Sequence, residues 1–195
     1  LSLHDALPIS SYSVELSLFV ETACKLLGIK PSKVKNQEAD DVVATSAAML
    51  TRIAGPNDRV TVVSGDKDLR QLISSRVDYY CLHEKRFVGS KEACAKFGVH
   101  TPAQIAVALA IIGDKGDGIK GVSRCGKKKV ESIFAKFDAS LPLGEVLLVV
   151  EQELGSDQRV AEFYSSLDKT LLSEDVQGVE VPERVSVSMC HEVLE

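Results

Sequence analysis

A glycine-rich, charged stretch at residues 113–129 separates two segments of helical pattern. It reads GDKGDGIKGVSRCGKKK and follows an apolar run, Ile105–Ile112, with the composition of a helix. Isolated glycines break helices and allow turns with positive φ, so Asp117–Gly126 is predicted to form a hairpin. Helical spacing of apolar residues resumes over Lys127–Phe137. The sequence therefore predicts a helix, a glycine-rich hairpin and a second helix with a basic start.

In the same stretch, both acidic side chains precede most of the basic ones. Asp114 and Asp117 lie near its beginning, and no acid occurs over residues 118–129. Free backbone N–H groups at the start of the second helix, flanked by lysines, favour a phosphate group. Carboxylates favour a hard metal ion. Together these features predict a metal-dependent enzyme that acts on a nucleic-acid backbone.

The rest of the chain alternates helical patterns with short β-branched runs. Val60–Ser64 is followed by a glycine, as expected for a buried parallel strand, and Val77–Leu82 is a second predicted strand. The other extended segments are predicted over Phe87–Val88, Thr170–Val181 and Val185–Met189. Helices are predicted over Val14–Leu27, Ala39–Ile53, Leu69–Ile73, Ser90–Phe97, Pro102–Ile112, Leu143–Leu154 and Gln158–Leu167. This order predicts an α/β fold with a mostly parallel sheet flanked by helices, and ligands at the carboxyl ends of the strands.

Composition narrows the class of protein. A chain of 195 residues, 45% hydrophobic and 26% charged, is long enough to bury a core and to form one or two domains. Its five cysteines include no CxxC pair, which favours a reducing compartment and argues against a disulfide framework or a zinc site. No apolar run approaches the length of a membrane span, so no membrane partner is expected.

The net charge of −5 is unevenly distributed. Residues 138–195 carry 13 acidic and 3 basic side chains, whereas residues 1–137 carry 15 acidic and 20 basic ones. Seven of those 15 acids are the candidate metal ligands described next, so the remaining surface of the first part is basic enough to meet phosphates. Lysines spread evenly over a solvated surface are the alternative, and only residues 120–129 form a cluster.

Three short acidic clusters carry the candidate catalytic and metal-binding residues. The first cluster, Glu38–Asp41, begins a predicted helix, where acids also complement the helix dipole. The second, Asp66 and Asp68, follows a predicted strand, where an acid could instead cap the next helix. The third, taken alone, would be an ordinary acidic turn. The candidate metal ligands are Glu38, Asp40, Asp41, Asp66, Asp68, Asp114 and Asp117, and all except Glu38 are also candidate catalytic residues.

The three acidic clusters and the residues around them, in their order along the chain, resemble three motifs of the 5′-nuclease family. This is the flap endonuclease group that includes the 5′-to-3′ exonuclease domain of bacterial DNA polymerase I. EADD at Glu38–Asp41 matches the family wording letter for letter. VVSGDKDLRQLIS is similar to the family's VVSGDKDLLQLVS, and GDKGDGIKGVSRCGKKKV is similar to GDSSDNIPGVPGIGPKTA. Gly118, Lys120 and Arg124 stand where that wording has Asn, Pro and Gly.

The resemblance implies a partial PIN-like nuclease core over residues 10–100 and a helix–hairpin–helix and C-terminal helical region over residues 101–195. It implies two Mg²⁺ or Mn²⁺ ions, the first held by Glu38–Asp41 and the second framed by the other four aspartates. The implied DNA-binding residues are Gly118, Lys120, Gly121, Arg124, Gly126, Lys127, Lys128 and Lys129. In relatives this hairpin often also binds a monovalent cation, so a K⁺ is implied there.

Electrostatics supports the metal ions independently. Seven carboxylates in one pocket raise one another's pKa, and two divalent cations relieve that repulsion. Oxygen ligands without histidine or cysteine favour Mg²⁺ or Mn²⁺ over zinc. Two ions about 4 Å apart stabilise the attacking and leaving oxygens of a phosphodiester hydrolysis.

The implied activity is Mg-dependent 5′-3′ exodeoxyribonuclease and flap endonuclease chemistry in replication and repair, on DNA with a 5′ flap, nick or free 5′ end. The enzyme would be free or one domain of a larger polymerase. The expected location is intracellular: cytoplasm or nucleoid in a bacterium, an organelle in a eukaryote. The alternatives are a non-catalytic DNA-binding module and a PIN-type ribonuclease; the hairpin after Asp117 argues against the latter.

The start of the chain carries a further expectation. Residues 1–9, LSLHDALPI, look like a translated sequencing adapter and are expected to be an artefact. Relatives have an earlier strand ending in an aspartate and a helical arch with a catalytic Lys or Arg, and neither occurs before EADD here. We therefore expect the natural full-length protein to be an active nuclease, and this chain alone to cleave poorly or not at all.

Overall fold

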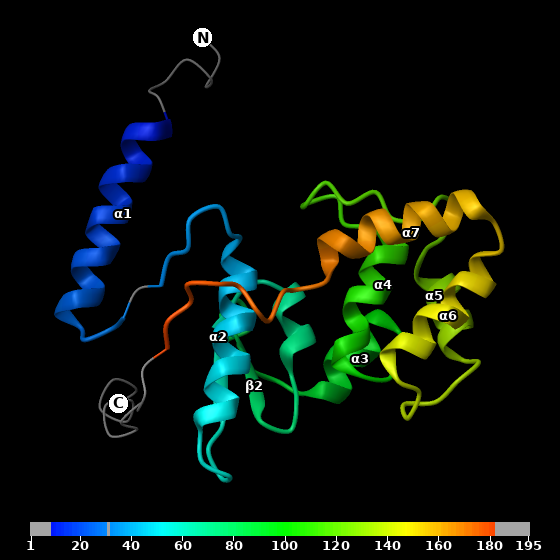
Figure 1. Ribbon diagram of the computed structural model, residues 1–195, viewed down its shortest axis with the longest axis horizontal. Helices are drawn as coiled ribbons and strands as arrows, with labels where there is room; N and C mark the ends of the chain where they lie inside the picture. Colours follow the sequence, from blue (N-terminus) through cyan, green and yellow to red (C-terminus); the bar gives the residue numbers. More distant parts are fainter. Residues whose placement is uncertain (1–8, 31, 182–195) are drawn as a thin grey trace. The chain divides into compact units, whose positions relative to one another are not determined.

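The structure is a computed structural model that describes residues 9–30 and 32–181. By its internal contacts the chain divides into two units, residues 1–35 and 36–195, and each is described by itself. The first unit contains helix α1 (Ile9–Leu26), and the second contains all the other described helices and strands (Figure 1). The predicted division between residues 100 and 101 remains a prediction.

Helix α1 ends at Leu26, one residue before the predicted Leu27 and close to the predicted glycine stop. Gly28 has φ 69°, a left-handed conformation that glycine adopts without strain. The N–H of Ile29 donates to the carbonyl of Cys24 at 2.7 Å and closes the last turn. The helix begins at Ile9, earlier than predicted and at the last residue of the expected artefact; the rest of that segment lies outside the described residues.

The second unit is built on a three-stranded sheet in the order β1-β2-β3. β1 (Val60–Ser64) pairs in parallel with β2 (Val77–Cys81), as predicted. β3 (Arg86–Val88) pairs with β2 in the antiparallel direction, so the sheet is mixed rather than mostly parallel. Residues 82–85 alone join β2 to β3, and a connection this short permits only an antiparallel pair.

Helix α2 (Ala39–Ile53) packs against β1 and has the predicted bounds. The segment after β1 is a 3₁₀ helix, η2 (Asp68–Leu72), and not the predicted α-helix Leu69–Ile73. The chain must reach Val77, where β2 begins, and the N–H of Ser74 already bonds the carbonyl of Val77 at 3.0 Å. The residues between β1 and β2 can therefore form only one short helical segment.

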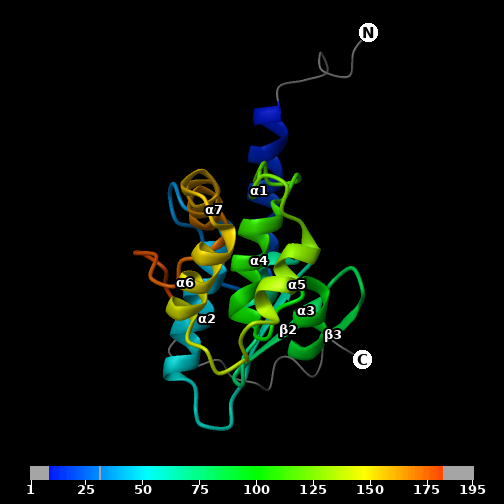
Figure 2. The same cartoon turned by 90° about the vertical axis from the view of Figure 1, so that its right-hand side faces the viewer.

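Helix α4 (Ile105–Ile112) is the central helix of the second unit. Residues 105–111 are all buried, because the helix is apolar on every side. Figure 2 shows α7 (Asp157–Thr170) on one side of α4, with α3 (Ser90–Phe97) and α5 (Lys127–Phe134) on the other. The predicted helix Pro102–Ile112 starts with a separate 3₁₀ turn, η3 (Pro102–Gln104).

Residues 90–112 are the one stretch within the described ranges that is long and apolar enough, by length and composition, to cross a membrane. The stretch is not one continuous helix, because Gly98 is left-handed with φ 75° and Pro102 begins a new turn. Its most apolar part, α4, is buried by other helices. These are the properties of a core helix of a globular unit.

The last helices follow the sequence closely. Helix α6 (Leu143–Leu154) has the predicted bounds. Helix α7 begins earlier than predicted because Ser156 caps it, accepting a hydrogen bond from the N–H of Arg159 at 3.4 Å. Helix α5 ends at Phe134, short of the predicted Phe137. Residues 171–181 form no strand, contrary to the predicted extended segment, and Val185–Met189 lie outside the described residues.

One hydrophobic core joins the sheet to the helices. It runs from Val62 and Tyr79 in the strands, through α4, to Phe134 in α5 and Phe163 in α7. Tyr79, Phe134 and Phe163 are among its largest fully buried side chains. The loops that follow β1 and α4 are therefore held by a common packed core.

Candidate metal centre

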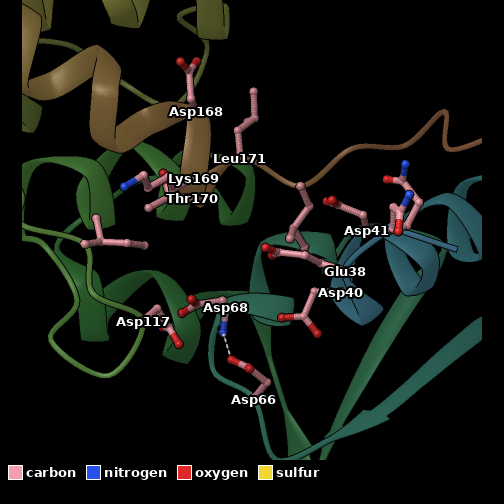
Figure 3. Close-up of a pocket in the computed structure, with 14 residues that line it drawn as sticks. Glu38, Asp40, Asp41, Asp66, Asp68, Asp117, Asp168, Lys169, Thr170 and Leu171 are labelled. Carbon is pink, nitrogen blue, oxygen red and sulfur yellow. Dashed lines mark hydrogen bonds between the residues drawn. The ribbon is translucent and has the colours of Figure 1, made fainter. Parts of the chain in front are cut away.

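Separate elements of the second unit bring the acidic clusters to one cavity of about 650 Å³ (Figure 3). The first cluster lies at the start of α2, the second follows β1, and Asp117 lies in the loop after α4. The acids that line this cavity are Glu38, Asp40, Asp41, Asp66, Asp68, Asp117 and Asp168. The structure thus brings all three predicted clusters together.

Asp68, Asp114 and Asp117 form the tightest group. One carboxylate oxygen from each lies within 4.8 Å of the others. A tight turn holds the last two: Asp114 and Ile119 exchange backbone hydrogen bonds of 2.8 and 2.7 Å, and the N–H of Gly116 donates to Asp114 Oδ1 at 2.9 Å. The loop that follows α4 therefore presents Asp114 and Asp117 toward the loop that follows β1.

Asp68 has an unsatisfied acceptor. Its Oδ1 is buried and has no hydrogen-bond partner in the described part of the chain. Asp66, in contrast, uses its Oδ1 to accept the N–H of Asp68 at 2.9 Å, which orders the loop. Buried polar atoms in folded proteins nearly always have a partner, so this oxygen indicates where a cation would bind. A donor set of carboxylate oxygens alone fits a hard divalent cation such as Mg²⁺.

Burial and like charges shift the ionisation of these acids. Burial, reinforced by the neighbouring aspartates and opposed by Lys67, raises the pKa of Asp68 to about 6. The pKa of Asp40 is raised too, first by burial and then by repulsion from Asp66 and other acids of the cavity. The first and second clusters therefore interact electrostatically across the cavity, as a shared site for cations requires.

We expect the metal-free chain to lose stability as the pH rises through this range. The pKa of folded Asp68, about 6, is above its ordinary value of 3.8, so the folded state binds the extra proton between these values. Stability from this group is present at low pH and lost as pH increases toward 7. Urea unfolding in EDTA should show a lower midpoint at about pH 7 than at about pH 5. Asp68→Asn should flatten this dependence; an equal slope in both proteins would contradict the assignment.

One cation already lies among the acids. Lys67 Nζ forms an ion pair with Oδ2 of Asp114, whose side chain is 10% exposed. This contact lowers the pKa of Asp114 and raises the pKa of Lys67. Lys67 therefore remains charged at neutral pH and offsets part of the negative charge of the centre.

Asp41 has a structural role as well. Its Oδ1 accepts the backbone N–H of Ser173 at 2.8 Å, and Thr45 Oγ1 donates to the Ser173 carbonyl at 3.1 Å. Gln71 Nε2 donates to the carbonyls of Asp68 at 3.0 Å and of Thr170 at 3.1 Å. These bonds fasten the chain around residues 170–173 to α2 and to the loop that carries Asp68.

Sequence reasoning missed the two charged residues that α7 contributes to the cavity, Asp168 and Lys169. The segment FYSSLDKTLLSEDVQGVEVP gave only a faint family resemblance, and no spacing relates these residues to the acidic clusters. Their place results from the packing of α7 along α4, which a local pattern does not encode.

The hairpin keeps its turns despite its departures from the family wording. Gly118, Gly121 and Arg124 all have positive φ, at 67°, 68° and 62°. A Cβ at Gly121 would lie 2.4 Å from the backbone nitrogen of Gly113, so these two backbone segments are in close contact. Arg124 adopts the left-handed conformation, which costs a non-glycine residue about 1–2 kcal/mol, at the position where the family wording has glycine.

The predicted DNA-binding side chains differ in their availability. Lys120, Arg124 and Lys128 are exposed and form no ion pair within the described residues. Two others form ion pairs: Lys127 Nζ lies 3.8 Å from Glu131 Oε1, and Lys129 Nζ lies 3.5 Å from Glu153 Oε2. The first three are therefore the basic side chains most free to meet an anion.

Residues 14–98 match the model of one protein family, described as the 5′-3′ exonuclease N-terminal resolvase-like domain. This segment is therefore similar to the N-terminal domain of 5′-3′ exonucleases. The match covers the first and second acidic clusters and ends before α4, so it leaves the third cluster and the hairpin outside.

Curated relatives extend the similarity beyond residues 14–98. A 5′-3′ exonuclease of Aquifex aeolicus is 29% identical over 81% of this chain and 56% of its own length. Flap endonuclease Xni of Vibrio cholerae is 28% identical over 76% of this chain and 52% of its own. DNA polymerase I of Rhizobium leguminosarum is 26% identical over 80% of this chain and 15% of its own. The chain thus spans about half the length of the two nucleases.

Solved structures share the fold of this chain. The T5 5′-exonuclease with bound zinc superposes with a TM-score of 0.59 at 21% identity, over 85% of this chain and 61% of that one. The T5 flap endonuclease in a complex with DNA and metal ions gives a TM-score of 0.55 at 19% identity, over 86% of this chain and 71% of that one. The predicted α/β fold is confirmed, and the helix–hairpin–helix assignment remains a prediction.

Proposed function

We propose that this chain is part of a structure-specific 5′-3′ exonuclease and flap endonuclease that hydrolyses DNA phosphodiester bonds. The observation that carries the proposal is the convergence of Asp68, Asp114 and Asp117 within 4.8 Å, with a buried Asp68 oxygen left unpaired. The names of the curated relatives, 5′-3′ exonuclease and flap endonuclease, support the same reaction.

The donor set supports two divalent ions, Mg²⁺ or Mn²⁺. Asp66, Asp68, Asp114 and Asp117 would hold one ion, and Glu38, Asp40 and Asp41 would help to hold the other. Bound divalent ions supply Lewis-acid stabilisation to the attacking and leaving oxygens of a phosphodiester. The side chains of this chain fix the charge and the position of that site through the loops after β1 and α4.

The hairpin would hold the DNA backbone next to this centre. Lys120, Arg124 and Lys128 offer unpaired positive charges, and α5 begins at Lys127, where free N–H groups favour a phosphate. Such contacts position a duplex without reading its bases, and they weaken as salt increases. A K⁺ at the hairpin belongs to the same proposal. The solved T5 complex with DNA and the polymerase relatives support a DNA substrate. We propose that this DNA carries a 5′ flap, a nick or a free 5′ end.

Cleavage of a 5′-labelled flap by an excess of this chain tests the proposal. We expect a short labelled product that forms slowly with Mg²⁺, is absent in EDTA, and falls at least about 100-fold in Asp117→Asn, because that change removes one of the three convergent carboxylates. Asp157→Asn, at the opposite end of α7 from the cavity, is the matched control and should keep the wild-type rate.

Two outcomes would contradict catalysis by this centre. Product that forms equally in Asp117→Asn would place the activity elsewhere. Tight, salt-sensitive flap binding with neither a Mg²⁺-dependent product nor a Mg²⁺-dependent gain in thermal stability would instead favour the alternative function, a non-catalytic DNA-binding module.

A further inference from the structure

Lys67 holds the one oxygen of Asp114 that the loop leaves free. Oδ1 of Asp114 accepts the N–H of Gly116 at 2.9 Å, and Oδ2 is in the ion pair with Lys67 Nζ. Both oxygens of this acid therefore have a protein partner, unlike Oδ1 of Asp68. A divalent ion that binds the group of three acids through Asp114 must share an oxygen with one of these partners or displace it.

We propose that Lys67 is a tethered cation that competes with the divalent ion for Asp114, so that it stabilises the empty centre and weakens metal binding. The inference rests on the proposed function. It assigns to this residue of the SGDKDL motif a role that is separate from those of the aspartates on either side of it.

Charge and chain geometry support competition. An ammonium group is a compact point charge, and it repels a divalent ion that approaches the same carboxylate. Lys67 lies between Asp66 and Asp68 in one loop, so its effective concentration at Asp114 stays high whether or not an ion is present. Without any cation, the carboxylates of Asp68, Asp114 and Asp117 would repel one another, and Lys67 offsets that repulsion.

The structure also offers a place for the released side chain. The side chain of Lys67 is 40% exposed, so it is not locked by packing. It lines a second cavity of about 620 Å³ together with Asp66, Glu84 and Asp117. After displacement from Asp114, the ammonium group therefore remains beside other carboxylates and does not lose all favourable contacts.

Titration calorimetry with Mn²⁺ on the full chain tests the inference. We expect Lys67→Met to bind Mn²⁺ about tenfold more tightly than wild type, because the tethered competitor is gone. The same variant should melt at a lower temperature in EDTA and gain more from Mn²⁺. Lys115→Met is the matched control: Lys115 is exposed, adjoins Asp114 and has no ion pair among the described residues. It should stay within about twofold of wild type, since exposed charges contribute little.

A measurement on the wild-type chain makes the test independent of the variant's folding. The ¹⁵N-labelled ammonium signal of Lys67, protected by its ion pair, should broaden or vanish as Mg²⁺ is added. Two results would overturn this inference and leave the proposed metal centre in place. The first is a Mn²⁺ affinity of Lys67→Met that equals or falls below that of Lys115→Met. The second is a Lys67 signal that is unchanged at saturating Mg²⁺. Failure of the wild-type chain to bind Mn²⁺ would overturn the proposed metal centre as well.

Discussion

Replacing Asp68 by asparagine is expected to stabilise the metal-free chain and to abolish its response to Mg²⁺. In the metal-free state the ionised carboxylate is half-buried among other acids and has an unpaired oxygen, which is why the pKa of Asp68 rises to about 6. The neutral amide removes this repulsion. After a discount for partial exposure, we expect a gain of about 1–2 kcal/mol at neutral pH.

The loss of the metal response follows from the same carboxylate. Wild type should gain about 2.7 kcal/mol at a Mg²⁺ concentration 100 times its Kd, and Asp68→Asn should gain almost nothing. Thermal unfolding of both proteins in EDTA and in Mg²⁺ measures the two effects together. Asp157→Asn should behave as wild type in the presence of the ion. A variant that is less stable in EDTA and still gains stability from Mg²⁺ would show that Asp68 has a structural role instead.

Gly121→Ala is expected to destabilise the chain by at least about 3 kcal/mol, from left-handed strain together with a backbone clash. Gly121 has φ 68°, and a Cβ there would lie 2.4 Å from the nitrogen of Gly113. Backbone cannot move aside as a flexible side chain can. The N–H of Val122 bonds the carbonyl of Ile111 at 2.9 Å, so the clash would separate the hairpin from the end of α4.

Gly118→Ala provides the matched control for this prediction. Its φ of 67° is nearly the same, but a Cβ there would meet nothing within 4 Å. It should therefore cost only the conformational strain, about 1–2 kcal/mol. Urea unfolding followed by circular dichroism gives both values, and equal costs for the two variants would show that the contact between Gly121 and Gly113 is unimportant.

Local patterns predicted the elements whose causes are local. The bounds of α2 and α6 follow from apolar spacing, and both were predicted residue for residue. The convergence of the acids was predicted from the resemblance of the three acidic motifs to those of one family, and the loop after β1 was expected at the carboxyl end of the sheet. The left-handed conformation of Arg124, where the family wording has glycine, did not follow from the sequence, because this conformation is unfavourable for a non-glycine residue.

Other features depend on packing and could not be read from the sequence. The antiparallel direction of β3 results from the length of one turn, and η2 is a 3₁₀ helix because β2 follows so soon. Asp168 reaches the cavity only because α7 packs along α4. The ion pair of Lys67 with Asp114 joins residues far apart in the chain, and no sequence periodicity predicts it.

The hydrogen bonds of residues 170–173 with Asp41 and Gln71 can form only late in translation. The acids of α2, β1 and the α4 loop leave the ribosome well before this late segment is made. A nascent chain therefore carries its mutually repelling carboxylates without the bonds that later secure Asp41 and the loop of Asp68. Asp41 and the loop of Asp68 are therefore secured only after α7 has been synthesised and has folded back.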